Sequence, residues 1–329
     1  MIRRRDFITL LGGAAAAWPL AVRAQQAGLP VVGFIGIEVS SEQEVGATSS
    51  LREGLRETGF VEGRNFILDI RLVADDFERL RAASSELVRR PVAVLVAAGS
   101  AKVAQAAQAA TSIIPIVFGN GSDPVKVGLV GSMSRPGGNA TGVTWFTSSL
   151  VPKRLELLRE LVPQARTIAF LINPTNPVSV GDTQEMQAAA LTLGQQIIVV
   201  KASTVDEIKA AFATVAREHI DAMLVDVDAF FASHPEQFAD LAVRYRIPVS
   251  YNYAGFVTAG GLMSYGDDRE VSRRWLGIYA GRILKGEKPA ELPVMQPTKF
   301  ELAINLKAAK AIGLAVPEPL LARADKVIE

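Results

Sequence analysis

The fold is decided by residues 91–120, which read PVAVLVAAGSAKVAQAAQAATSIIPIVFGN. Val92 to Ala97 form a short apolar run, the pattern of a strand that is buried on both faces. After Gly99-Ser100, the segment Ala101 to Ala110 is rich in alanine, which favours a helix. A second apolar run follows at Ile114 to Phe118. This order of strand, helix and strand predicts parallel strands that are joined by a crossover helix.

The same alternation runs through the rest of the chain. Short apolar or β-branched runs predict further strands at Val31–Ile35, Phe66–Ile70, Thr141–Trp145, Thr167–Ile172, Gln196–Val200, Ala222–Val225, Ile247–Ser250 and around Phe300–Ile304. Helical stretches with end signals predict helices at Glu42–Thr58, Phe77–Arg89, Pro152–Leu161, Gly181–Leu193, Val205–Arg217 and Pro235–Tyr245, and one that ends at Leu284. The elements fall into two similar units. We therefore predict an α/β fold with two doubly wound, Rossmann-like lobes.

We expect the chain to cross between these lobes more than once. The predicted N-terminal lobe comprises residues 28–143 with about 262–288, and the C-terminal lobe comprises 144–261 with about 289–325. Several crossing segments make a hinge, which favours opening and closing about a ligand. Ligands of such sheets bind outside the carboxyl ends of the strands, so the cleft between the lobes is the predicted site.

Composition excludes several classes of protein. The 329 residues include 35 Lys and Arg, 34 Asp and Glu and no cysteine. The balanced charge argues against a nucleic-acid partner, and the lack of cysteine excludes disulfides, thiolate zinc sites, a cysteine nucleophile and a lipidated N-terminal cysteine. The two histidines, His219 and His234, resemble surface residues, and no catalytic or metal-binding motif accompanies them. We expect no catalysis, no metal and no cofactor.

Residues 1–24 have the pattern of an export signal. The basic head Arg3-Arg4-Arg5 precedes an uncharged stretch from Phe7 to Val22, and the small residues Val22 and Ala24 suit cleavage after Ala24. The run Arg4 to Thr9 resembles a twin-arginine signal. The alternative is a membrane anchor, but Gly12-Gly13 and Pro19 interrupt the apolar stretch. We predict export and a periplasmic location.

Three loops that follow predicted strands lead directly into helices, where backbone N–H groups can hold an anion such as a carboxylate. They contain Ser100, then Gly121 and Ser122, then Asn173 and Asn176. Ser100 and Ser122 are the predicted carboxylate ligands. The alternative for each serine is that its hydroxyl only caps its own helix.

One of these loops also imitates the start of a dinucleotide fingerprint. It reads Gly119-Asn120-Gly121-Ser122-Asp123-Pro124, with proline in place of the third glycine. It also follows the fourth strand, whereas the fingerprint belongs to the first strand–helix turn. A tight turn is the better interpretation.

For a ligand amino group we expect Asp228 to be the acceptor, because Asp226-Val227-Asp228 follows a predicted strand at the cleft end of the second lobe. The alternative is that Asp228 caps the next helix. Aromatic side chains can cover the apolar part of a ligand. Tyr251 and Tyr253 are candidates that share a strand face, and Tyr265 in the crossover and Glu38 after the first strand complete the predicted site.

Several segments together resemble one family over nearly the whole chain. They are residues 3–26, Pro30–Phe34, Gly54–Phe60, Ser122–Lys126, Arg135–Asn139, Lys153–Leu158, Gly260–Gly266, Gln296–Leu302, Asn305–Lys307 and Leu320–Asp325. They resemble the substrate-binding proteins of ABC transporters, of the tryptophan- and tyrosine-binding type. The resemblance implies the type 1 periplasmic binding protein fold, a Venus flytrap that hands a small solute to a membrane permease.

The resemblance also implies a monomer and a small-molecule ligand, with aromatic or branched amino acids first and aromatic carboxylates or other organic acids next. This chain has Val227-Asp228-Ala229 where related amino-acid receptors have a Thr-Asp-Asn-like turn. The ligand therefore need not be an amino acid. Two alternatives to transport stay open. The same fold can serve as a periplasmic sensor for a signalling receptor, and an enzyme is the other class.

Overall fold

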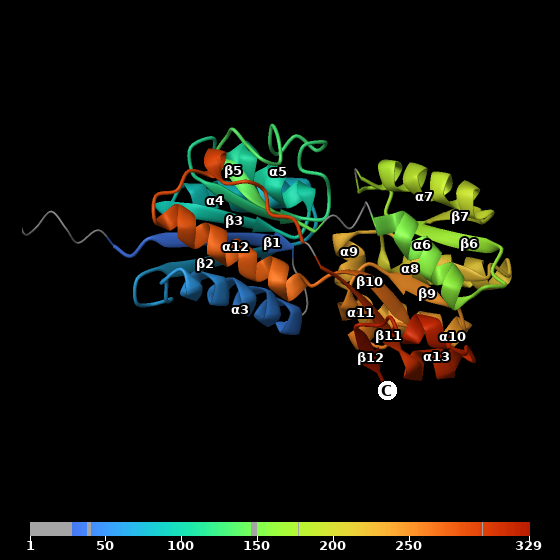
Figure 1. The fold of residues 1–329 in the computed structure, drawn as a ribbon. Coiled ribbons are helices and arrows are strands. Elements are labelled where there is room, and N and C mark those ends of the chain that lie inside the picture. The colour runs from blue at the N-terminus through green and yellow to red at the C-terminus, as the bar shows by residue number, and fades with distance from the viewer. Residues whose placement is uncertain (1–27, 38–40, 146–149, 177, 298) are drawn as a thin grey trace, which may run out of the picture.

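The computed structural model describes residues 28–37, 41–145, 150–176, 178–297 and 299–329. The predicted signal peptide lies outside these ranges. Figure 1 shows two lobes, each with a central sheet that is covered by helices on both faces. The predicted α/β fold with two doubly wound lobes is confirmed.

The first lobe contains a five-stranded parallel sheet in the order β2-β1-β3-β4-β5. These strands are β1 (Val31–Ile37), β2 (Ile67–Val73), β3 (Val92–Ala98), β4 (Ile116–Asn120) and β5 (Ala140–Thr144). Helices α4 (Phe77–Val88) and α5 (Ala101–Ala110) pack on one face of the sheet in a common core. Helices α3 (Ser41–Glu57) and α12 (Arg269–Leu284) cover the other face. The strands read as continuous apolar runs because both faces are covered.

The second lobe contains a seven-stranded sheet in the order β12-β11-β10-β9-β8-β6-β7. Its strands are β6 (Thr167–Ile172), β7 (Gln196–Lys201), β8 (Ala222–Val225), β9 (Val249–Tyr251), β10 (Met263–Asp267), β11 (Phe300–Asn305) and β12 (Lys326–Ile328). Only the β10–β11 pair is antiparallel among the described pairs.

Helices bury both faces of this second sheet. On one face lie α6 (Val151–Leu161) and α7 (Ser179–Leu193), and their core also takes in α13 (Leu306–Ile312) and α14 (Glu318–Leu321). On the other face lie α8 (Val205–Arg217), α9 (Ala229–Ala232), α10 (Pro235–Tyr245) and α11 (Ala254–Thr258).

The chain crosses between the lobes three times. At two of these crossings the observed lobe boundary differs from the predicted one. Strand β10 belongs to the second sheet, so the return to the first lobe occurs at about residue 268 and not at 262. Residues 289–295, expected in the second lobe, stay with the first. They include the short 3-10 helix η3 (Pro289–Glu291), and the Thr141 hydroxyl donates to the Leu292 carbonyl at 2.7 Å. Met295 also forms a β-bridge with Val143 at the edge of the first sheet.

Helix α12 crosses α3 so closely that glycine is required at the contact. A Cβ atom on Gly277 would lie 2.1 Å from the Leu51 carbonyl oxygen, and one on Gly54 would lie 1.9 Å from the Arg274 carbonyl oxygen. Both neighbours are backbone atoms, so they cannot move aside as a flexible side chain would. The glycines therefore fix the position of α12 on the first lobe.

We expect Gly277→Ala to destabilise the protein by about 2 kcal/mol, because the added methyl group forces the two helices apart. Urea unfolding of the variant and the wild type measures this loss. Gly181→Ala on α7 is the matched control, since nothing lies within 4 Å of its Cβ position. That control should gain about 0.5 to 1 kcal/mol from helix propensity. Equal stability of Gly277→Ala and wild type would contradict the close crossing.

Candidate functional site

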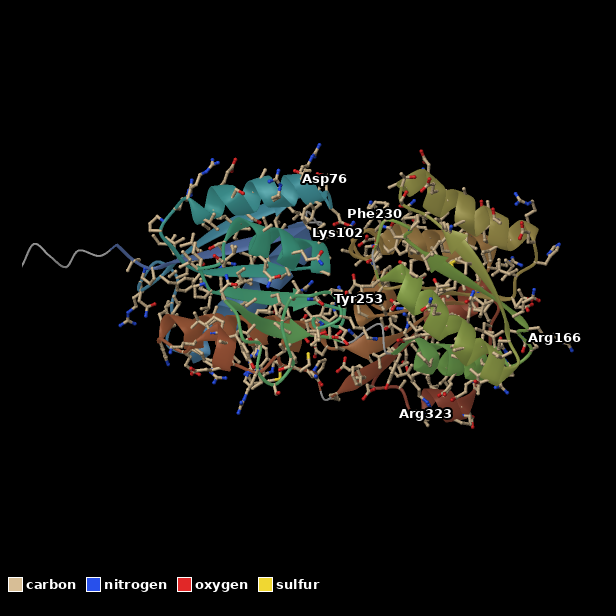
Figure 2. All side chains as sticks on the ribbon, turned by 90° about the horizontal axis from the view of Figure 1, so that it is seen from above. Asp76, Lys102, Arg166, Phe230, Tyr253 and Arg323 are labelled. Atoms are coloured by element: carbon tan, nitrogen blue, oxygen red, sulfur yellow. The ribbon has the colours of Figure 1, made fainter. Side chains whose placement is uncertain are left out.

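A cavity of about 730 Å³ lies between the two lobes, at the carboxyl ends of both sheets. Its first-lobe side includes Ser100, Gly121, Ser122, Arg269 and Arg273, and its second-lobe side includes Asn176, Val227, Asp228 and Tyr253. Figure 2 shows Tyr253 and Lys102 at the junction of the lobes, with Arg166 at the far end of the second lobe. The predicted cleft is therefore present, and six of the ten predicted residues line it.

Ser100 begins α5 but does not cap it with its side chain. Its backbone is extended at φ −149° and ψ 169°, with no side-chain cap hydrogen bond, and its Oγ is buried without a partner in the described part of the chain. Gly99 makes the preceding turn possible with a φ of +130°. The Ser100 hydroxyl therefore does not cap α5, contrary to the alternative from the sequence. Ser100 lines the cavity instead.

Ser122 is held in place by its backbone. Its N–H donates to Asn120 Oδ1 at 2.8 Å, and its carbonyl accepts from the Thr144 hydroxyl at 2.9 Å. These bonds tie the loop after β4 to the end of β5. The loop thus presents Gly121 and Ser122 to the cavity as a fixed surface.

Asp228 does cap a helix, as the alternative from the sequence proposed. Its Oδ1 accepts from the Phe231 N–H at 3.1 Å and from Asn173 Nδ2 at 3.2 Å, while its Oδ2 accepts from Asn176 Nδ2 at 3.1 Å. Burial raises the pKa of the Asp228 carboxyl, and the hydrogen bonds from Asn173 and the Phe231 N–H partly offset the shift. Asn173 is not among the cavity-lining residues, and it acts on the site through Asp228.

We expect Asp228→Ala to cost about 1 kcal/mol of stability through loss of the helix cap. Asp228→Ser should recover most of that loss, because a serine hydroxyl caps in the same way. Chemical denaturation of the three proteins measures the difference. An alanine variant as stable as wild type, or a serine variant no better than alanine, would show that the cap contributes nothing.

Besides Asn173, three predicted residues do not line the cavity in the structure or lie outside the described residues. Tyr251 is 0% exposed and stacks on Phe256 in the core of the second lobe, with ring centroids 4.5 Å apart. Tyr265 packs against the core on the other face of the second sheet, where α6 and α7 lie, and its ring lies near Phe300. Glu38 lies outside the described residues. Tyr251 and Tyr253 diverge because Tyr251 ends β9, whereas Tyr253 begins α11.

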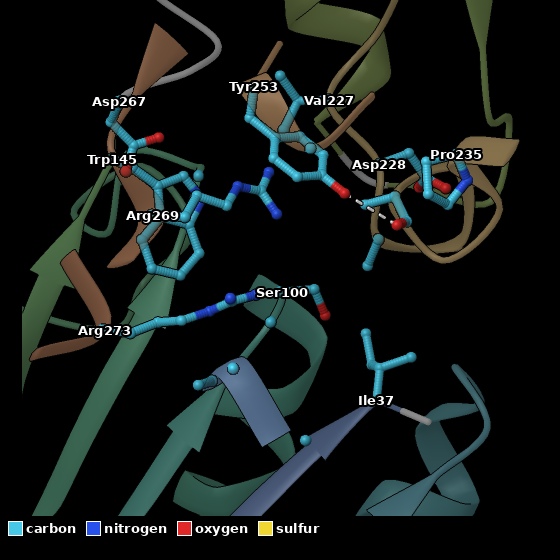
Figure 3. Close-up of a pocket in the computed structure, with 18 of the residues that line it drawn as sticks. Ile37, Ser100, Trp145, Val227, Asp228, Pro235, Tyr253, Asp267, Arg269 and Arg273 are labelled. Atoms are coloured by element: carbon cyan, nitrogen blue, oxygen red, sulfur yellow. Dashed lines mark hydrogen bonds between the residues drawn. The ribbon is translucent and has the colours of Figure 1, made fainter. Parts of the chain in front are cut away.

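Two arginines and a tryptophan in the cavity were not predicted. Arg269 lies over the Tyr253 ring, with its Cζ 3.9 Å from the ring centroid, and 5.8 Å from the Trp145 ring. Arg273 follows one helical turn later on α12 and points into the same space (Figure 3). Burial, followed by the charge of Arg269, lowers the pKa of Arg273. The spacing of four residues on one helix was the available signal, since it places both side chains on one face.

A fully buried arginine bonds to the strands that lead into the second-lobe side of the cavity. Arg154 on α6 donates from one Nη to the carbonyls of Val225, at the end of β8, and Ser250, on β9. The loops that carry Asp228 and Tyr253 begin just after these strands. Burial lowers the pKa of Arg154 to about 10, an effect that Asp226 and Asp182 oppose, so the guanidinium is charged at neutral pH.

This architecture agrees with comparisons with known proteins. The sequence model of the ABC transporter substrate binding protein family matches residues 35–328. The chain belongs to this family. Its lobes have the type 1 periplasmic binding protein fold, the Venus flytrap.

Among the relatives of this substrate-binding protein, one is named for tyrosine binding and another was solved with L-Trp. A tyrosine-binding protein of Clostridioides difficile (strain R20291) is 28% identical over 262 residues, which are 80% of this chain and 75% of the relative. An ABC domain from Streptococcus pneumoniae, solved in complex with L-Trp, is 25% identical with a TM-score of 0.83 and covers 92% of this chain and 100% of its own. A ligand-free, open substrate-binding protein from Clostridium difficile is 27% identical with a TM-score of 0.68, covering 91% and 99%.

The two solved relatives differ in how well they superpose, although identity and coverage are alike. This substrate-binding protein superposes on the L-Trp complex with a TM-score of 0.83 and on the open structure with a TM-score of 0.68. Its lobes are therefore arranged more like those of the complex than like those of the open form.

In the described ranges, no three His, Cys, Asp or Glu side chains gather as a potential metal site. None of the helices described for this chain combines the length and apolar character needed to cross a bilayer.

Proposed function

We propose that this chain is the extracytoplasmic solute receptor of an ABC importer. It binds a small organic solute between its lobes and delivers it to the membrane permease. The observation that carries the proposal is the interlobe cavity of about 730 Å³, whose lining is shared by both lobes. A cavity of this size suits a small organic molecule.

Solute binding is coupled to closure because the lining residues come from separate bodies. Ser100, Ser122 and Arg273 move with the first lobe, and Asp228 and Tyr253 move with the second. A solute that contacts both groups stabilises the closed form and shifts the population toward it. The permease then has a closed, loaded receptor to recognise. Three crossing segments restrict the motion to a hinge.

The relatives support an aromatic amino acid or a related organic acid as the solute. One relative is named a tyrosine-binding protein, and the other was solved with L-Trp. The aromatic rings of Trp145 and Tyr253 in the cavity suit the apolar part of such a molecule.

A thermal-shift screen of the protein against amino acids, aromatic acids, purines and sugars tests this function. Solute at 100 times its Kd adds about 2.7 kcal/mol of stability, so one chemical class should raise the melting temperature clearly. Absence of any shift across a broad solute library, with protein that was unfolded and refolded to remove bound molecules, would count against a solute receptor.

Export through the twin-arginine route is part of the proposal. Replacing Arg4 and Arg5 with lysine should leave the uncleaved protein in the cytoplasm, because that pathway reads the arginine pair. Immunoblots of periplasmic and cytoplasmic fractions measure this. Unchanged export of the lysine variant would argue for the general secretory route.

A further inference from the structure

Resting on the proposed function, we infer that the solute is an aromatic carboxylate that lacks an α-ammonium group. The inference depends on which charges in the cavity have partners and which do not. It narrows the solute class, and it sets this chain apart from relatives that bind amino acids.

The cationic side of the cavity comes from α12. The helix carries four arginines, Arg269, Arg273, Arg274 and Arg282. The two that face away from the cavity are paired, Arg274 with Glu57 and Arg282 with Glu287. The two that line the cavity have no carboxylate within 4 Å among the described residues. The unpaired arginines are therefore the ones that a solute meets.

Arg269 and Arg273 lie one helical turn apart on α12 and line the same cavity, so their like charges repel each other. The charge of Arg269 adds to the burial of Arg273 in lowering the Arg273 pKa. A carboxylate offers a planar pair of acceptors that guanidinium groups bind in a bidentate manner. It would remove the repulsion and supply the missing partner. The N-terminus of the ten-residue helix α5, at the same cavity, favours negative charge as well.

The inner carboxylates of the cavity, Asp228 and Asp267, each already accept at least one hydrogen bond from the protein. Asp228 accepts from Asn173, Asn176 and the Phe231 N–H. Asp267 accepts from the Ser272 hydroxyl at 2.8 Å. Its other oxygen has no hydrogen-bond partner in the described part of the chain. Burial raises the pKa of this carboxyl, and the nearby charge of Arg269 opposes that shift, so an ammonium group there would compete with Arg269. An ammonium group would also lie near two guanidinium groups, and like charges repel.

The rest of the cavity suits a ring. Trp145 and Tyr253 lie on either side of Arg269, and Figure 3 shows the Tyr253 ring above that guanidinium. Phe34, Ile37 and Leu72 add apolar surface on the first-lobe side. A solute whose carboxylate reaches Arg273 can place its ring among these side chains, where stacking on Arg or Trp is favourable.

A matched series of nine compounds tests the inference by titration calorimetry. Three frameworks, phenyl, 4-hydroxyphenyl and indole, are each used as the 3-propionate, as the L-amino acid and as the ethylamine. We expect at least one propionate to bind, at least tenfold more tightly than its amino acid. The matching amine should bind at least 100-fold more weakly than the propionate.

The outcomes separate this inference from the proposed function. An amino acid that binds more tightly than its propionate overturns the inference and supports the proposed function. An amine that matches its propionate also overturns the inference, because the carboxylate then contributes nothing. Binding of none of the nine overturns it too, and the broader solute screen then decides the proposed function separately.

Discussion

Arg273→Met is expected to weaken binding of a carboxylate solute by about 100-fold and to raise the melting temperature of the ligand-free protein. Hydrogen bonds to a charged partner contribute about 1.5 to 3 kcal/mol, which corresponds to roughly 10- to 150-fold in affinity. Methionine keeps the apolar stem that packs in the cavity wall and removes the charge. Because burial and Arg269 both oppose that charge, its loss should stabilise the empty protein by about 1 kcal/mol.

Opposite changes in affinity and stability separate a binding role from a structural one. Replacing a residue that only supported the fold would lower both the affinity and the stability. Arg274→Met is the matched control, since Arg274 is the next residue of α12 and pairs with Glu57 outside the cavity. It should leave affinity within about twofold and change the melting temperature little, because an exposed ion pair contributes little to stability. Titration calorimetry and thermal unfolding of the two variants measure these effects. Undiminished affinity in Arg273→Met would remove Arg273 from the site.

Arg154→Met should produce the largest loss of stability, about 3 to 5 kcal/mol, because it removes the charge that compensates buried carboxyls. Arg154 and Asp226 are both 0% exposed, and Asp182 lies close enough to raise the Asp226 pKa. The change also removes the donor to the Val225 and Ser250 carbonyls, so the loops of Asp228 and Tyr253 lose their support. Urea unfolding measures the loss.

The cost of Arg154→Met should grow as the pH rises. Burial and Asp182 raise the pKa of Asp226 well above its unfolded value of about 3.9, and Arg154 opposes that shift. Between the unfolded and folded pKa values the folded state holds more protons, so stability falls with increasing pH. Without Arg154 the pKa of Asp226 in the folded state rises further. The variant therefore loses additional stability at pH values above the wild-type folded pKa of Asp226. Adding Asp226→Asn should recover part of the stability and flatten its pH dependence. A loss that stays constant at every pH at which both proteins fold would contradict the buried-charge explanation.

Much of the fold was predictable because both faces of each sheet are covered. Runs such as Val92–Ala97 and Ile168–Ile172 are apolar at every position, and this pattern identifies them as buried strands from the sequence alone. Strand β10 was not predicted, since Met263-Ser264-Tyr265-Gly266-Asp267 mixes polar and apolar side chains. Its place in the second sheet moved the lobe boundary from the expected position.

The site was predictable only as far as loop positions allow. The loops of Ser100, Ser122, Asn176 and Asp228 reach the cavity because they follow parallel strands. The direction of individual side chains was not predictable. In the pair Arg273-Arg274 nothing in the sequence says which residue faces the cavity, because that depends on how α12 is rotated against α3. The close approach at Gly277 and Gly54 sets that rotation.

The most direct test of the account is small-angle X-ray scattering of the protein with and without the solute that gives the largest thermal shift. If the two lobes close on an anionic solute, the radius of gyration should fall when the solute is added to refolded, ligand-free protein. Arg273→Met at the same solute concentration should keep the larger radius. A wild-type scattering curve that stays unchanged at saturating solute would contradict a receptor that works by closing its lobes.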